Sequence, residues 1–204
     1  MCRYNIVIHK NRTYRMRQKL DSVAKIFIGV ATARYKYNPS KGKEDKRSYL
    51  LFSQNMLSDT GILQMYQPDT FIASKDLSFS CTQEGDIIFG LRKPNGAVYI
   101  DKNHTNLLVQ SYMAIIRCNT DIILPEYLAF RLNTSDIQNQ LQKDIQGGTA
   151  IQLLKIQSLK EVVIDIPNIE KQKQLISVLK TGYSEIQVLE QIIQHKQQLL
   201  KSII

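Results

Sequence analysis

The chain has 204 residues, of which 43% are hydrophobic and 22% are charged, and its formal net charge is +9. This composition suits one folded domain with an extension and excludes a chain that is disordered throughout. Because no apolar run reaches about 18 residues and the first residues lack the apolar stretch of a secretory signal, we expect neither a membrane span nor secretion.

The excess positive charge lies in the first quarter of the chain. Residues 1–50 contain 13 lysines and arginines against 3 acidic residues, whereas residues 51–204 contain 14 against 15. Surface lysines commonly serve only solubility, but a surplus this concentrated, interleaved with tyrosines, indicates a polyanionic partner. Nucleic acid is favoured over an acidic membrane, because no amphipathic basic helix is visible. The tyrosines are Tyr4, Tyr14, Tyr35, Tyr37 and Tyr49.

The first fifty residues predict few regular elements. Residues 1–18 form a basic amino-terminal segment, within which residues 6–8 are prone to form a strand. Residues 20–28 carry apolar side chains at mixed spacing, which predicts a short helix running into a strand that ends near Gly29. Residues 31–47 are polar, basic and rich in turn residues, so we expect a long loop or irregular hairpin there.

From residue 48 the sequence changes to short β-prone runs separated by turns. The glycine-bounded run at residues 87–91 has the pattern of a buried strand, and Pro94-Asn95-Gly96 predicts a hairpin turn. Short strands at this spacing indicate a compact, largely antiparallel β-structure. The runs are residues 49–52, 70–73, 77–81, 87–91, 97–100 and 112–117.

A helical section follows the strands. Pro125 is suited to the first turn of a helix, and Thr134-Ser135 can cap a second helix that Gly147-Gly148 would end. Residues 162–166 predict a late strand. We therefore predict an α+β fold, with a mostly antiparallel β-domain, short helices and a long carboxy-terminal helix. The expected parts are a basic segment at residues 1–18, a domain at 19–167 and the helix at 168–204.

The last 35 residues, Glu170 to Ile204, predict one uninterrupted helix, which would be about 50 Å long. Residues along it recur at the four-then-three spacing of a coiled-coil seam, interrupted only by Gly182 and Lys196. A helix packed only on its own domain would need about half this length. We expect it to project and pair with another chain. The seam comprises Leu175, Leu179, Gly182, Ile186, Leu189, Ile193, Lys196, Leu200 and Ile203, and the expected dimer-interface residues are Leu179, Ile186, Leu189, Ile193 and Leu200.

Motifs for catalysis are missing from the sequence. It contains no glycine-rich phosphate loop, and its three cysteines and three histidines are scattered without metal-ligand spacing. Glu84 and Asp86 are paired carboxylates, but Leu91-Arg92-Lys93 lacks the acid that a metal-dependent nuclease would place before its lysine. We expect a cytoplasmic binding protein with reduced cysteines, no metal and no cofactor, and not an enzyme.

Several segments in order resemble the target-recognition domain of specificity subunits from type I restriction-modification systems. Lys19 to Ile26 followed by Gly29 is similar to the opening of that domain, and Gly85 to Arg92 followed by Gly96 resembles its central strand and turn. Val109-Gln110-Ser111 and Pro125-Glu126-Tyr127-Leu128 look like the next segments. The closing part resembles Gly148 to Ile151, Leu159-Lys160 and Ile164 to Pro167, after which Ile169-Glu170-Lys171-Gln172 enters the long helix.

The resemblance implies a prokaryotic, cytoplasmic protein that reads double-stranded DNA. A full specificity subunit carries two recognition domains and two long helices, whereas this sequence has one set. The resemblance therefore implies a half-subunit that forms a homodimer through an antiparallel pair of helices. It also implies partners that supply the chemistry, an adenine methyltransferase subunit and a restriction subunit.

We expect cations of the basic region to position DNA through phosphates, and groups beside the hairpin turn to read bases. The phosphate candidates are Arg12, Arg15, Arg17, Arg34, Lys36, Lys41, Lys43, Lys46 and Arg47, and the base candidates are Arg92, Lys93 and Asn95. Three alternatives stay open: a coiled-coil adaptor whose basic segment binds an acidic protein, the target-recognition fragment of a single-chain restriction-methylation enzyme, and a small independent nuclease.

Overall fold

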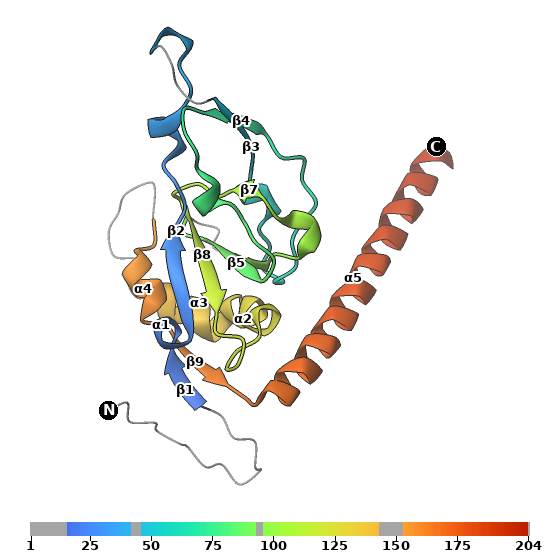
Figure 1. Cartoon of the computed structure of the whole chain (residues 1–204). Helices are drawn as coiled ribbons and strands as arrows, with labels where there is room; N and C mark the ends of the chain where they lie inside the picture. The colour runs from blue at the N-terminus through green and yellow to red at the C-terminus, as the bar shows by residue number, and fades with distance from the viewer. Residues whose placement is uncertain (1–15, 42–45, 93–95, 143–152, 204) are drawn as a thin grey trace.

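The computed structural model describes residues 16–41, 46–92, 96–142 and 153–203, and it confirms the α+β fold (Figure 1). Antiparallel pairing dominates its sheets, and one long helix ends the described chain. None of the helices within these ranges is long and apolar enough to cross a bilayer.

A four-stranded antiparallel sheet forms the centre of the domain. Its strands lie in the order β2 (Ala24–Ile28), β8 (Met113–Cys118), β5 (Asp86–Gly90) and β6 (Ala97–Tyr99). Ile87 and Phe89 of β5 pack into one core cluster and Ile88 into another, because alternate side chains of a strand point to opposite faces. Both faces of the sheet are therefore covered.

Short helices cover one face of this sheet. They are α1 (Leu20–Val23), α2 (Pro125–Leu132), α3 (Ser135–Gln142) and α4 (Ile156–Lys160). Pro125 occupies the first turn of α2, where the missing N–H costs no hydrogen bond. Asn133 ends α2, and its side-chain amide bonds both the N–H and the carbonyl of Ala97 at 2.9 and 2.8 Å. This contact fixes α2 against the edge strand β6.

A smaller β-lobe lies against the other face and carries most of the residues expected to form a loop. Its strands lie in the order β4 (Thr70–Ala73), β3 (Arg47–Leu51) and β7 (Leu107–Leu108), with β3 and β7 parallel. In the described residues, five short 3-10 helices lie in the segments that enter, join or leave these strands, namely η1 (Thr32–Tyr35), η2 (Pro39–Lys41), η3 (Gln54–Met56), η4 (Ser78–Ser80) and η5 (Lys102–His104).

At the opposite end, β1 (Met16–Lys19) pairs with β9 (Val163–Ile166), and the chain then enters α5 (Ile169–Ile203). β1 begins within the segment expected to be a basic extension. The last residues of that segment therefore pair with β9, the strand that precedes α5. The predicted long helix is confirmed as a single element. Figure 1 shows α5 leaving the domain beside β9 and extending along one side of it.

The prediction of a strand at residues 77–81 was wrong, because Ser78–Ser80 forms a 3-10 turn. The carboxylate of Asp76 accepts the N–H of Ser78 at 2.9 Å, and the Tyr49 hydroxyl accepts the N–H of Leu77 at 2.8 Å. Side chains thus satisfy backbone groups that a ladder would have used. The expected strand at residues 6–8 and the turn at residues 94–96 lie largely outside the described residues.

Gly29 is required where β2 meets the segment before β8. A Cβ at this position would lie 2.5 Å from the Val109 carbonyl oxygen and would also overlap the Gln110 carbonyl, both of them backbone atoms. Gly29→Ala should therefore lower the free energy of unfolding by about 2–3 kcal/mol, measured by urea denaturation. Gly85→Ala is the control, because its Cβ meets no atom within 4 Å and it tests only the strain of a positive φ. Equal losses in both variants would contradict the steric explanation.

Candidate nucleic-acid interface

The β-lobe gathers cations that lie far apart in the sequence. Lys36 forms a bridge to Ala73 of β4, and Arg47 of β3 is paired with the same Ala73, so the two cations flank β4. The N–H of Ser74 donates to the Tyr35 carbonyl at 2.8 Å, and the N–H of Tyr37 to Ile72 at 3.0 Å. Five exposed residues form what we call the cationic lobe surface: Arg34, Lys36, Lys46, Arg47 and Lys75.

Half-buried tyrosines support two of these cations. The Lys75 Nζ lies 4.1 Å from the centroid of the Tyr35 ring, and the Lys46 Nζ lies 5.9 Å from that of Tyr37. Each ring holds the ammonium group by cation–π attraction while the charge stays exposed to solvent. Counting charges along the sequence had missed Lys75, because it lies outside the first fifty residues and only the pairing of β4 brings it here.

Asp76 is held ionised within the same lobe. The Ser78 N–H lowers the pKa of this carboxyl most, followed by the hydroxyl of Tyr49, which donates at 2.8 Å. Burial in turn raises the pKa of Tyr49. These hydrogen bonds to the Asp76 carboxylate order the turn between β4 and η4. The carboxylate therefore stabilises the lobe next to Lys75.

Arg92 is linked to the lobe through the top of the central sheet. Its guanidinium carbon lies 5.1 Å from the centroid of the Tyr112 ring, and burial raises the pKa of that tyrosine, against the opposing effects of Arg92 and Gln110. Gln110 is bridged to Val30 and accepts the Thr32 hydroxyl at 3.5 Å. Arg92, a predicted base reader, is therefore connected to the segment that carries Arg34.

Among the remaining DNA-binding candidates, Arg17 has a described side chain, and it lies away from this group. Arg17 lies in β1 at the far end of the central sheet, where its Nε is 3.8 Å from an oxygen of Asp165. Lys41 ends η2, and only its backbone is described. The candidates Arg12, Arg15, Lys43, Lys93 and Asn95 lie outside the described residues.

An ion pair that the sequence did not indicate joins β5 and β8, the two inner strands of the central sheet, at their ends. Asp86 is only 2% exposed, and Arg117 donates to its two oxygens from Nε at 2.9 Å and from Nη2 at 3.3 Å. The Arg117 guanidinium carbon also lies 5.5 Å from the Phe27 ring centroid. Asp86 is thus a structural partner of Arg117, and within the described residues no three acidic, histidine or cysteine side chains could together hold a metal.

The first half of α5 is packed on the domain. Gln172 is fully buried, where its side chain accepts the Leu124 N–H at 2.8 Å and donates to the carbonyls of Ile122 and Pro167. Further along, Tyr183 stacks on Phe130 with ring centroids 6.0 Å apart. The expected interface residue Leu179 is half-buried in this contact.

The second half of α5 projects and leaves its apolar side chains in solvent. The four other expected interface residues are exposed: Ile186 by 49%, Leu189 by 59%, Ile193 by 55% and Leu200 by 63%. An exposed apolar stripe of this kind indicates an interaction surface. The helix therefore has two functions along its length, attachment to the domain and then presentation of an apolar seam.

Comparison with known proteins gives one family. Residues 19–196 match the model of the type I restriction modification DNA specificity domain. The chain is 37% identical over 109 residues to the type I restriction enzyme MjaIX specificity subunit of Methanocaldococcus jannaschii, covering 52% of this chain and 24% of the relative. It is 24% identical over 125 residues to the HindI specificity subunit of Haemophilus influenzae, covering 59% and 27%.

Solved structures show the same fold. The HsdS subunit from Thermoanaerobacter tengcongensis aligns with a TM-score of 0.61 at 19% identity, over 86% of this chain and 44% of that one. The S subunit from M. genitalium aligns with a TM-score of 0.54 at 15% identity, over 94% and 45%. This chain thus spans about a quarter of the length of the curated relatives and less than half of the solved subunits.

Proposed function

This chain belongs to the type I restriction-modification DNA specificity family, and we propose that it is a non-catalytic half-subunit that reads one half of a bipartite DNA site. The cationic lobe surface is the observation that carries the proposal. Its cations are exposed and spread over three adjacent segments, and two of them, Lys46 and Lys75, are supported by tyrosines, which suits contacts to successive phosphates of a duplex.

Base reading is assigned to the neighbouring top of the sheet. Arg92 extends from the end of β5 over Tyr112, and a planar guanidinium can bond guanine through two parallel hydrogen bonds. Lys93 and Asn95 follow it directly in the sequence, so we keep them as base-reading candidates. Arg12, Arg15, Arg17, Lys41 and Lys43 remain phosphate candidates on charge alone.

The partners follow from the family and from the length of its members. We propose that residues 19–167 act as the recognition domain, that residues 1–18 add basic contacts, and that residues 168–204 form the spacer helix. A second copy of the chain would supply the second domain that the longer relatives have room for. A methyltransferase subunit and a restriction subunit would then perform the chemistry in the cytoplasm.

The test removes three cations from the lobe and compares the loss with a matched control. Arg34→Ala, Lys36→Ala and Lys75→Ala together should weaken binding to a 30-base-pair duplex of random sequence about 100-fold at 0.1 M salt, and reduce the salt slope by about 3. Fluorescence anisotropy measures both.

The control triple variant loses the same charge elsewhere, at exposed Lys155, Lys173 and Lys201. It should bind within about threefold of the parent chain, because its cations lie off the lobe. Equal losses in the two variants would show that net charge, and not this surface, binds DNA. Failure of the parent chain to bind a duplex, while it binds an acidic protein, would favour the adaptor alternative.

A further inference from the structure

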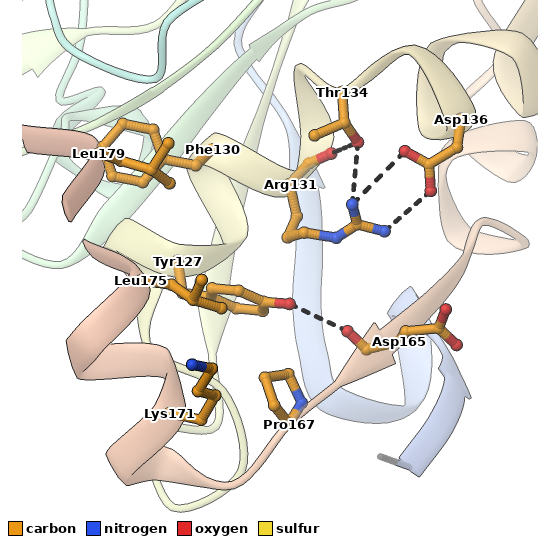
Figure 2. Close-up of a pocket in the computed structure, with 10 residues that line it drawn as sticks. All are labelled: Tyr127, Phe130, Arg131, Thr134, Asp136, Asp165, Pro167, Lys171, Leu175 and Leu179. Atoms are coloured by element: carbon orange, nitrogen blue, oxygen red, sulfur yellow. Dashed lines mark hydrogen bonds and ion pairs between the residues drawn. The ribbon is translucent and has the colours of Figure 1, made fainter. Parts of the chain in front are cut away.

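The apolar seam of α5 does not stop where the helix leaves the domain. A groove of about 500 Å³ lies between α2, the end of β9 and the first turns of α5. Figure 2 shows the side chains that line it. Its apolar lining includes Tyr127, Phe130 and Pro167, together with the seam residues Leu175 and Leu179. The exposed seam of the projecting half therefore runs directly into an open groove on the same side of the helix.

The length of the seam decides how much of it a partner must cover. The projecting part, from Ile186 to Ile203, is 18 residues or two and a half heptads, which is short of the three to four heptads that mark a coiled coil. Extending the contact to Leu179 gives 25 residues, about three and a half heptads. A stable pairing therefore needs the part of the seam that borders the groove.

Building on the proposed function, we propose that a second copy of this chain lies antiparallel on this face, with Gly182 of each copy opposite Leu200 of the other. This register places the two-fold axis at Gln191 and sets Leu189 against Ile193 of the second copy. Residue 203 of the second copy then lies level with Leu179, at the mouth of the groove. The two residues that interrupt the seam decide between this register and its neighbours.

Gly182 provides the first argument. A Cβ built on it would meet no atom of the rest of the described chain within 4 Å, so the seam has a gap at this position. The large side chain of Leu200 is 63% exposed in one copy and would fill that gap in the other. A parallel pair in register would instead set the two glycines against each other and leave the gap open.

Lys196 provides the second argument. In the proposed register it lies opposite Ile186, directly beside Glu185, so its ammonium group can pair with that carboxylate at the edge of the seam. A shift of one heptad towards the domain would place it beside Lys180, and a shift towards the tip would place it between Ile192 and Gln194. A parallel pair would set the two lysines together. The proposed register thus pairs both interruptions with complementary groups.

Disulfide trapping tests the register directly. Gly182→Cys with Leu200→Cys, in a chain that also carries Cys2→Ser, should yield at least half of the protein as a covalent dimer after mild oxidation at pH 8. The native Cys81 and Cys118 can stay, because burial raises the pKa of their thiols to about 11 and about 12.

Two further cysteine variants distinguish the outcomes. Leu200→Cys alone should give less than about a tenth of the covalent dimer, whereas efficient trapping through it would establish a parallel pair and overturn the proposal. Efficient trapping through Leu189→Cys with Leu200→Cys, and not through the first pair, would establish the register shifted towards the tip. That result would overturn this inference and leave the homodimer intact, whereas a monomeric parent chain would reject the homodimer itself.

Exchanging the charges of Lys196 and Glu185 tests the register independently. Sedimentation measures the dissociation constant of the dimer. Lys196→Glu and Glu185→Lys should each weaken dimerisation about tenfold, since two symmetric pairs are lost in every dimer. Combining them should restore the dissociation constant to within about threefold of the parent value. Two losses that simply add would show that the residues do not meet across the interface, and would overturn the proposal.

Discussion

A chain carrying Leu189→Glu and Ile193→Glu should be a monomer at concentrations where the parent chain is a dimer. Both side chains are more than half exposed in one copy and would be buried between two. Each dimer would then have to bury four unpaired carboxylates, each at a cost of several kcal/mol, so we expect its dissociation constant to rise at least about 1000-fold. Analytical ultracentrifugation over a range of concentrations measures the change.

The same variant should keep its fold but have a much lower affinity for a two-part DNA site. Because Leu189 and Ile193 project from the domain, the thermal midpoint of the globular part should stay within about 2 °C of the parent value. Gln187→Glu with Gln194→Glu is the control, since it adds equal charge off the seam and should remain a dimer. An unchanged dimer in the seam variant would mean that the projecting stripe is not the interface.

Affinity for duplex DNA should fall about 1000-fold between 50 mM and 200 mM salt. Six or more phosphate contacts, each releasing about one counterion, would produce a decrease of this size. The cationic lobe surface would supply five of the cations, and the other phosphate candidates, such as Arg12 and Arg15, would supply the rest. The measurement is a titration of a fixed duplex by anisotropy at four salt concentrations, plotted as the logarithm of affinity against the logarithm of salt.

An affinity that does not change with salt would show that the cationic lobe surface is not part of the DNA interface. Single-stranded DNA of the same length is a useful comparison, because its lower charge density should give a shallower slope for the same number of contacts. A steep slope with duplex that persists in the monomeric seam variant would show that one domain alone makes the phosphate contacts. Loss of the slope in that variant would mean that the contacts require both domains.

Local patterns predicted most of the elements. The helix of residues 169–203, the opening of α2 at Pro125 and the buried strand β5 all follow from periodicity, capping and composition within short windows. The transition from α1 to β2 before Gly29 was predicted in the same way. The pattern failed at residues 77–81, where Asp76 and Tyr49 bond backbone groups and form a turn in place of a strand.

Elements with little pattern of their own were missed. The two-residue strand β7 and the five-residue helix α4 are too short for periodicity to mark them, and both exist because neighbouring elements pack on them. β1 forms because the late strand β9 offers it a partner nearly 150 positions further along the chain. Such pairing cannot be read from a window of the sequence.

The sequence indicated only some of the charged residues that the structure brings together. Charge counting indicated a polyanion partner and included Lys36 and Arg47, which the structure brings to the two sides of β4, together with Arg34 of the preceding η1. It did not include Lys75, and it treated Asp86 as half of a carboxylate pair, although the register of β5 with β8 joins it to Arg117. Which charges meet is a property of strand pairing.

The sequence by itself determined that the chain ends in one long helix with an apolar seam, because helical periodicity is a local property of side-chain spacing. Only the tertiary structure decided how that seam is divided. Gln172 and Tyr183 attach the first half to α2 and the residue before it, and nothing in the described part of the chain covers the second half. Spacing records which side chains share a face, but long-range packing determines which of them remain exposed to bind a partner.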